Sequence, residues 1–267
     1  MMWNKLFELR GDLPKKIRLT CEVIGISLIL LLWYAVTDGY HIVPAGIFPS
    51  PVKIISSLNE LYYQDAVVLN LIQSFKLNVF GALEAVLVAI PIGFAIGLFP
   101  VLRSVFLRYV VSVRFLPLSA LVGVFIVIFG IDSAMKMQFL AFSVFIYLLP
   151  AVIRRIDEVE QVYTQTTYTL GATKWQTIRL VFIPNVLSKV YEDIRDLAAL
   201  SWTYIIIAEM VNASGGGIGA LAFKASRQAR IDKVFMILIL IVGVGILMDA
   251  VMQLFGQIIF PYKVKKG

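Results

Sequence analysis

The sequence predicts an all-α polytopic membrane protein with six transmembrane helices, on the basis of two observations. Hydrophobic residues make up 60% of the 267-residue chain, whereas charged residues make up only 15%. A soluble domain carries about a quarter charged residues, so the apolar excess must face something other than water. The apolar residues also gather in runs of the roughly 20 residues that a helix needs to cross a bilayer. We expect one transmembrane domain over 1–267, since no linker divides the chain.

The six predicted spans are separated by polar segments. They are residues 19–36, 77–99, 109–129, 135–153, 197–211 and 234–255. A basic leader at 1–18 precedes the first span. A cleaved signal peptide would also explain this pattern, but no small-residue cleavage site follows, so we expect an uncleaved helix. Between the first two spans, Ser50 and Pro51 begin a predicted surface helix over 50–70.

The basic residues predict the orientation. Lys and Arg are concentrated in the leader, in 154–193 and in the C-terminal tail, and are sparser in the alternate segments apart from a cluster at 224–233. Basic segments of membrane proteins stay in the cytoplasm, so we predict that both termini and 154–193 are cytoplasmic. Because these residues lie beside apolar runs, the net charge of +7 does not indicate nucleic-acid binding.

The segment 154–193 is longer than a connection between helices needs to be, and its pattern predicts the first helix of a hairpin. Acidic residues would lie in the first turn of this helix, where they favour the positive end of the helix dipole; they are Asp157, Glu158 and Glu160. Residues at three- and four-residue steps would form its amphipathic face. These are Val159, Val162, Tyr163, Thr166 and Leu170.

A glycine turn and a second helix are expected to follow. Gly171 has the position of a left-handed helix end, and Thr173 to Gln176 has the T-x-x-Q form of a capping box. The second helix would run to about Ile183 and end at Pro184. Such a hairpin either docks on a partner subunit or rests on lipid, and the pattern alone leaves both interpretations open.

The same segment carries a family resemblance. QTTYTLGATKWQTIRLVFIP resembles the cytoplasmic signature of ABC-importer permeases, in which E-A-A, three residues, glycine, nine residues and I-x-L-P follow one another. The spacing from Gly171 to Pro184 matches this signature. Gln165, Thr166 and Thr167 replace the E-A-A residues, so the first position lacks the carboxylate that the family would use in a salt bridge.

Further motifs extend the resemblance to nearly the whole chain and narrow it to permeases for nitrate, sulfonate, taurine and bicarbonate. They are FPSP at 48–51, VRFLPLSAL at 113–121, FGID at 129–132, AEM at 208–210 and SGGGIG at 214–219. The resemblance implies a type I importer permease in a prokaryotic inner membrane, with a small anion as its substrate.

The resemblance also implies partners. A cytoplasmic ATP-binding cassette ATPase, an external solute-binding protein and a second permease copy would assemble with this chain in the lipid membrane. The ATPase would bind ATP and Mg, and this chain would bind no cofactor; it has no G-x-x-x-x-G-K-[ST] motif. The hairpin would be a coupling helix seated on the ATPase. Its coupling residues would be Gln165, Thr166, Thr167, Gly171, Ala172 and Pro184.

Polar residues within the predicted spans are candidates for a substrate pathway, because such residues are costly in lipid. The candidates are Arg114, Ser119, Ser201, Trp202 and Tyr204. Arg114 would be a positive site on an anion path or would reach the membrane surface. Glu84 would pair with a basic group, line the path or reach the surface. Glu209 and Asp249 are expected at membrane interfaces or in helix packing.

Small residues and prolines predict how the spans pack. Ala89, Gly93 and Gly97 form a stripe at four-residue steps, which favours close helix packing in lipid. Pro91 and Pro117 are expected to kink their helices. G-x-G-x-x-A at 217–222 follows a predicted span rather than a strand, so it does not indicate dinucleotide binding.

Two other classes of function fit a chain of apolar helices. A secondary transporter or channel driven by ion gradients would explain Glu84 and Arg114 without an ATPase, although no inverted repeat is evident. An intramembrane enzyme would need acid–base or metal chemistry. The chain has one histidine, His41, and one cysteine, Cys21, which excludes a His/Cys metal cluster and an intrachain disulfide. We therefore predict a translocation subunit, not an enzyme.

Overall fold

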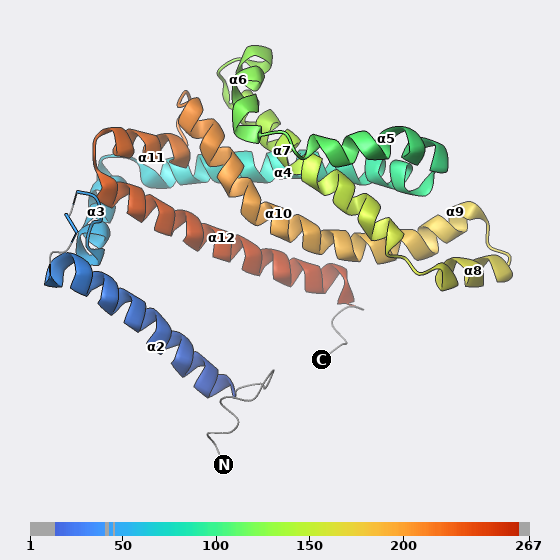
Figure 1. Ribbon diagram of the computed structural model, residues 1–267, viewed down its shortest axis with the longest axis horizontal. Coiled ribbons are helices and arrows are strands. Elements are labelled where there is room, and N and C mark those ends of the chain that lie inside the picture. Colours follow the sequence, from blue (N-terminus) through green and yellow to red (C-terminus); the bar gives the residue numbers. More distant parts are fainter. Residues whose placement is uncertain (1–13, 41–42, 45, 262–267) are drawn as a thin grey trace. The chain divides into compact units, whose positions relative to one another are not determined.

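The computed structural model describes residues 14–40, 43–44 and 46–261, and every regular element among them is a helix (Figure 1). The predictions for the leader before residue 14, for His41 and for the tail after residue 261 lie outside the described residues. The described chain forms two compact units. One contains the residues up to Gln64 together with Ala225–Met236, and the other contains Asp65–Lys224 and the residues from Ile237 onward.

The first unit contains α2 (Lys15–Tyr34), the π-helical turn η1 (Ala35–Gly39), α3 (Pro51–Tyr63) and the start of α12. The predicted start of the surface helix is confirmed: Ser50 is its N-cap, accepting a hydrogen bond from the Lys53 N–H at 3.4 Å. The helix ends at Tyr63 rather than at residue 70. Glu60 of α3 pairs with Arg230 at 2.8 Å, which fixes α3 against the chain that precedes α12.

In the second unit, α4 (Val67–Leu98) packs along α7 (Ser133–Asp157). The predicted stripe of small residues lies in this contact. Ala89 is fully buried, and a Cβ atom at Gly93 would come within 2.6 Å of Val152. At Gly97 the same addition would come within 2.5 Å of Ile156. The two helices therefore approach too closely for any side chain larger than those present, as the stripe predicts.

The predicted third span is not one helix. It is divided into α5 (Pro100–Val113) and α6 (Leu118–Phe129), which meet at an angle of 105°. Pro117 is the N-cap of α6, and proline disfavours the helical conformation of the residue before it. Proline therefore breaks the helix here, whereas Pro91 lies inside an uninterrupted α4.

Four of the described helices are long and apolar enough to cross a membrane. They are α2 with η1, α4, α7 and α12 (Ile231–Ile259), and the bent pair α5–α6 would make a fifth. The remaining predicted span lies in α10 (Ile183–Val211), which begins well before residue 197. Its first half is charged, because it carries Lys189, Glu192, Asp193, Arg195 and Asp196.

Candidate functional site

The predicted hairpin is present at one end of the second unit. α8 (Gln161–Thr169) and α9 (Lys174–Thr177) flank Gly171, whose φ of +80° lies in the left-handed region. Thr173 and Gln176 form the predicted capping box: the Gln176 side chain accepts from the Thr173 N–H at 2.8 Å, and Thr173 Oγ1 accepts from the Gln176 N–H at 3.3 Å. The glycine turn and the cap are therefore both confirmed.

The predicted end of the second helix is wrong. Instead of stopping at Pro184, α9 continues through the π-helical turn η2 (Ile178–Phe182) into α10. Pro184 lies in the first turn of α10 and cannot donate a backbone hydrogen bond. The π-helical turn η2 directly precedes this helix. One helical path therefore leads from the tip of the hairpin to Val211.

The hairpin presents apolar side chains that the other described residues leave exposed. Trp175 is 67% exposed and Leu170 is 81% exposed, and Val162, Tyr163 and Tyr168 are also more than half exposed. Contiguous apolar groups on a surface mark a site of interaction with protein or membrane. Val162, Tyr163 and Leu170 of the predicted face are exposed, but α8 buries no residue against the described chain, so the predicted amphipathic character of this helix stays a prediction.

The structure brings most of the predicted coupling residues together in this hairpin. Gln165 and Thr166 are exposed on α8, whereas Thr167 and Ala172 are half-buried. The Ala172 N–H donates to the Thr167 carbonyl at 3.0 Å, and Thr167 Oγ1 lies 3.3 Å from Thr177 Oγ1 of α9. These contacts hold the turn closed. Pro184 lies outside the turn, on the helical path into α10.

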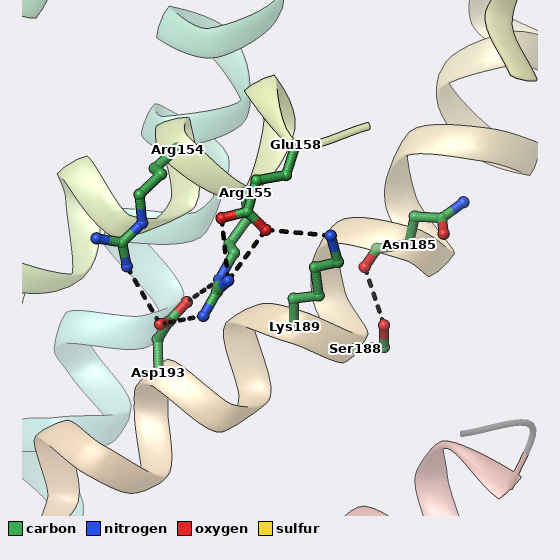
Figure 2. Close-up of polar contacts among 7 residues, drawn as sticks. All are labelled: Arg154, Arg155, Glu158, Asn185, Ser188, Lys189 and Asp193. Atoms are coloured by element: carbon green, nitrogen blue, oxygen red, sulfur yellow. Dashed lines mark hydrogen bonds and ion pairs between the residues drawn. The ribbon is translucent and has the colours of Figure 1, made fainter. Parts of the chain in front are cut away.

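An ion-pair network joins α7 to α10 at the base of the hairpin (Figure 2). Arg155 Nε and Nη2 donate to the two carboxylate oxygens of Asp193, both at 2.8 Å. Glu158 accepts from Arg155 at 3.0 Å and from Lys189 at 3.1 Å. We call Arg155, Glu158, Lys189 and Asp193 the latch. It ties the end of α7, which leads into the hairpin, to α10, which leads out of it.

The prediction that the three acidic residues at 157–160 lie in the first turn of a helix is wrong. None of them lies in a first helical turn. Asp157 ends α7 and pairs with Arg103 of α5 at 2.6 and 2.7 Å, and Glu158 belongs to the latch. Glu160 is the N-cap of α8. The reason is that α7 continues to Asp157, and its charged end finds partners on neighbouring helices that periodicity along one segment does not reveal.

Glu158 remains ionised at neutral pH. Burial alone would raise its pKa, but the hydrogen bonds from Arg155 and Lys189 outweigh burial and hold the pKa of Glu158 below its ordinary value. Its contribution to stability is therefore complete above the pKa of the unfolded chain and is lost as the pH falls through the lowered folded-state value. The latch should accordingly be insensitive to pH in the neutral range.

Replacing Arg155 with methionine should destabilise the protein more than the same replacement at Arg154. Arg155→Met leaves Asp193, whose side chain is only 10% exposed, without its bidentate partner, which costs about 1–3 kcal/mol. Arg154 is 62% exposed and lies 3.5 Å from Asp193, so Arg154→Met should cost less than about 1 kcal/mol. Thermal unfolding of the two purified variants measures the difference, and equal melting temperatures would contradict the latch.

The predicted pathway residues do not form one site. Arg114 lines a cleft of about 380 Å³ together with Arg154, Asp193 and Tyr147, and Tyr147 stacks on Tyr204 with ring centroids 6.3 Å apart. Two of the candidates are therefore at or beside this cleft, which we call the arginine cleft.

The other three pathway candidates lie elsewhere. Ser119 is exposed on α6. Ser201 and Trp202 are buried inside the helix packing, where Ser201 Oγ donates to Asn78 Oδ1 at 2.9 Å.

Asp249, predicted at an interface or in packing, pairs with Arg195 at 2.7 Å and so links α12 to α10.

Residues 214–219, which we call the glycine loop, follow the C-terminal end of α10. Two buried charged side chains, Lys136 and Glu209, form hydrogen bonds with this loop. Lys136 is fully buried and donates through Nζ to the carbonyls of Ser214 and Gly216 at 2.7 and 2.8 Å. Glu209, also fully buried, accepts from Ser74 Oγ at 2.6 Å and from the Gly219 N–H at 2.8 Å. The loop is therefore fixed by α7 and α10, the same helices that the latch joins.

Lys136 was not a candidate in the sequence, where it lies at the start of the predicted span 135–153. The one sequence feature that could have identified Lys136 is its position at the start of an apolar run, because a buried lysine needs a hydrogen-bond acceptor. Glu209 was expected in helix packing or at an interface, and the structure places it inside the packing.

Comparisons with known proteins agree on a family. Residues 89–260 match the family described as binding-protein-dependent transport system inner membrane component. The taurine transport system permease protein TauC of Escherichia coli K12 is 22% identical over 93% of this chain and 92% of its own. The putative aliphatic sulfonates transport permease protein SsuC of Bacillus subtilis 168 is 23% identical over 89% and 85%.

A solved structure shares the fold. A crystal structure of an amino acid ABC transporter with histidines superposes with a TM-score of 0.55, covering 77% of this chain and 97% of that one at 17% sequence identity. The all-helical fold predicted from the apolar runs is thus found in a transporter of known structure.

Proposed function

The chain belongs to the family of binding-protein-dependent transport system inner membrane components, and from this premise we propose that its α8–α9 hairpin couples transport to a separate ATP-hydrolysing subunit. It is an ABC importer permease, a translocation component rather than an enzyme. The observation that carries the proposal is the hairpin itself: a left-handed glycine turn with uncovered apolar side chains, tied by ion pairs to two long helices.

Continuity of the helix supports a mechanical role. From Lys174 the path through η2 and α10 reaches Val211, which is roughly 55–60 Å at the helical rise of 1.5 Å per residue. A displacement of the hairpin is therefore transmitted along α10 toward the glycine loop, and the latch carries α7 with it. Such rigid-body movement of packed helices is a common way to switch between two states.

The proposed partners follow from this arrangement. The ATPase would bind ATP and Mg and would receive Gly171 and the apolar residues around it. The hairpin end would face the cytoplasm, since Arg154, Arg155 and Lys174 lie there. The glycine loop would then face outward, toward the external solute-binding protein. A second permease copy and lipid would cover exposed apolar helices such as α2.

The proposed substrate is a small anion of the sulfonate class, including taurine. Two observations support this class: the functions in the names of the relatives TauC and SsuC, and the pair of arginines, Arg114 and Arg154, in the arginine cleft. Guanidinium groups are well suited to planar and tetrahedral oxyanions because they donate several hydrogen bonds in a fixed geometry.

Reconstitution tests the proposal. The chain, together with its cognate ATPase and solute-binding protein, is expected to import taurine or an alkanesulfonate into proteoliposomes only when ATP is present. Arg114→Gln should reduce uptake by about tenfold, the loss expected from one charge-assisted hydrogen bond of about 1.4 kcal/mol. Uptake driven by an ion gradient, without ATP or ATPase, would instead identify a secondary transporter.

A further inference from the structure

A second cleft, distinct from the arginine cleft, surrounds a carboxylate near the middle of α4. Glu84 lies in this cleft of about 270 Å³, which α4, α6 and α7 form together. Its lining is otherwise almost wholly apolar and aromatic, with Gln138 as the only other polar residue. Four phenylalanines complete it: Phe125, Phe129, Phe142 and Phe145.

Among the residues that the structure describes, Glu84 has no cationic partner in this cleft. Both of its carboxylate oxygens accept from Gln138 Nε2, at 3.1 and 3.0 Å, and Gln138 is a neutral donor. None of the residues that line the cleft is basic. A carboxylate inside a membrane-spanning helix is costly, and such groups are usually paired and functional. From the sequence, Glu84 could pair with a basic group, line a path or reach the membrane surface. The structure shows Gln138, not a basic side chain, as its partner.

The aromatic lining indicates which kind of cation would complete the site. The Phe125 ring lies 5.6 Å from Phe129 and 5.5 Å from Phe142, so three of the four phenylalanines that line the cleft form one aromatic cluster beside Glu84. Aromatic faces attract organic cations, above all alkylammonium groups, through their quadrupole. A metal ion such as Ca²⁺ or Mg²⁺ would need about six oxygen ligands, which one carboxylate and one amide do not supply.

We propose that this cleft binds the ammonium group of a small organic solute, with Glu84 as the counter-ion and the phenylalanines as an aromatic cage. Its volume of about 270 Å³ is slightly below the usual range of small-molecule pockets, which fits a zwitterion or alkylammonium of a few carbon atoms. As a statement about the transported solute, the inference rests on the proposed function and narrows the substrate to compounds that carry an amine. The binding site itself requires no ATPase.

Equilibrium binding of radiolabelled tetramethylammonium to the purified full chain in lipid nanodiscs tests the site directly. Wild-type chain should bind the probe saturably. Glu84→Gln, which keeps the shape and the Gln138 contact, should weaken binding at least tenfold. Phe142→Leu, which keeps apolar volume but removes a ring face, should weaken it several-fold. Phe80→Leu is the matched control, because Phe80 is on α4, is 58% exposed and does not line the cleft.

The outcomes separate this inference from the proposed function. No saturable binding to the wild type, or equal binding by Glu84→Gln, overturns the ammonium site, whatever the transport assay shows. In the reconstituted importer, Glu84→Gln should reduce uptake of taurine but spare ethanesulfonate, which lacks an amine. Equal loss for both substrates would also overturn the inference, whereas failure of all ATP-driven uptake would count against the proposed function alone.

Discussion

Gly171→Asp will abolish ATP-driven transport while leaving the chain folded and inserted. Apart from its chain neighbours, a Cβ atom at this position meets no atom of the described residues within 4 Å, and aspartate tolerates a left-handed backbone better than most residues. The cost to folding is therefore about 1 kcal/mol. At an interface with the ATPase, a buried unpaired charge costs roughly 3 kcal/mol or more, a loss on the order of 100-fold. Uptake and ATPase activity in proteoliposomes measure the effect.

Gly130→Asp is the matched control for this variant. Gly130 follows α6, has a φ of +79°, and likewise places an added Cβ more than 4 Å from the side chains and backbone that the structure describes beyond its neighbours. Both substitutions place the same charge on a residue with positive φ, and the ψ of −163° at Gly130 is a conformation nearly confined to glycine, so the control carries strain of its own. The residue is not part of the hairpin. Gly130→Asp should therefore transport at near wild-type rates. Equal loss in both variants, or full activity of Gly171→Asp, would contradict the role of the hairpin.

Gly217→Ala should prevent the protein from folding stably. Gly217 has a φ of +112°, and an added Cβ would overlap the carboxylate of Glu209. The backbone strain costs about 1–3 kcal/mol, and displacing buried Glu209 from Ser74 and Gly219 costs about 1–3 kcal/mol more. Together these approach the whole stability of a typical domain. Fluorescence-detected size exclusion and thermal unfolding would show aggregated or strongly destabilised protein.

Gly215→Ala separates strain from collision in the same loop. Gly215 is also left-handed, with a φ of +73°, but the nearest atom to an added Cβ is the Ser133 hydroxyl at 3.4 Å. Only the backbone strain remains in this variant, so its free energy of unfolding should fall by about 1–2 kcal/mol. If Gly217→Ala and Gly215→Ala melted at the same temperature, the buried contacts of Glu209 would not be what holds the glycine loop.

Local features of this fold could be predicted from the sequence. The hairpin turn depends on one glycine and one capping box, both set by neighbours a few residues away, and the structure confirms them. The stripe at Ala89, Gly93 and Gly97 likewise predicts a close helix contact without naming the partner helix. Apolar runs predict the spans because the length of a spanning helix is set by the bilayer.

Features that depend on distant partners could not be predicted in this way. Asp193 binds Arg155 across 38 positions, and Lys136 reaches Ser214 across 78. Neither pairing has a local pattern, so the latch and the buried lysine were missed. The helix through Pro184 was missed for another reason: proline ends most helices, and the π-helical turn before it leaves no clear mark on the sequence.

Site-specific cross-linking from position 175 tests the central claim that a separate ATPase subunit binds the hairpin. In a Cys21→Ser background, Trp175→Cys carries a photo-reactive group at an exposed site beside the turn, and Tyr62→Cys, 57% exposed on α3, serves as the control. The account predicts that only the Trp175→Cys chain forms an adduct with the ATP-hydrolysing subunit, and that an impermeant thiol reagent fails to reach it in intact cells. An adduct from α3 alone, or labelling of the hairpin from outside the cell, would contradict the account.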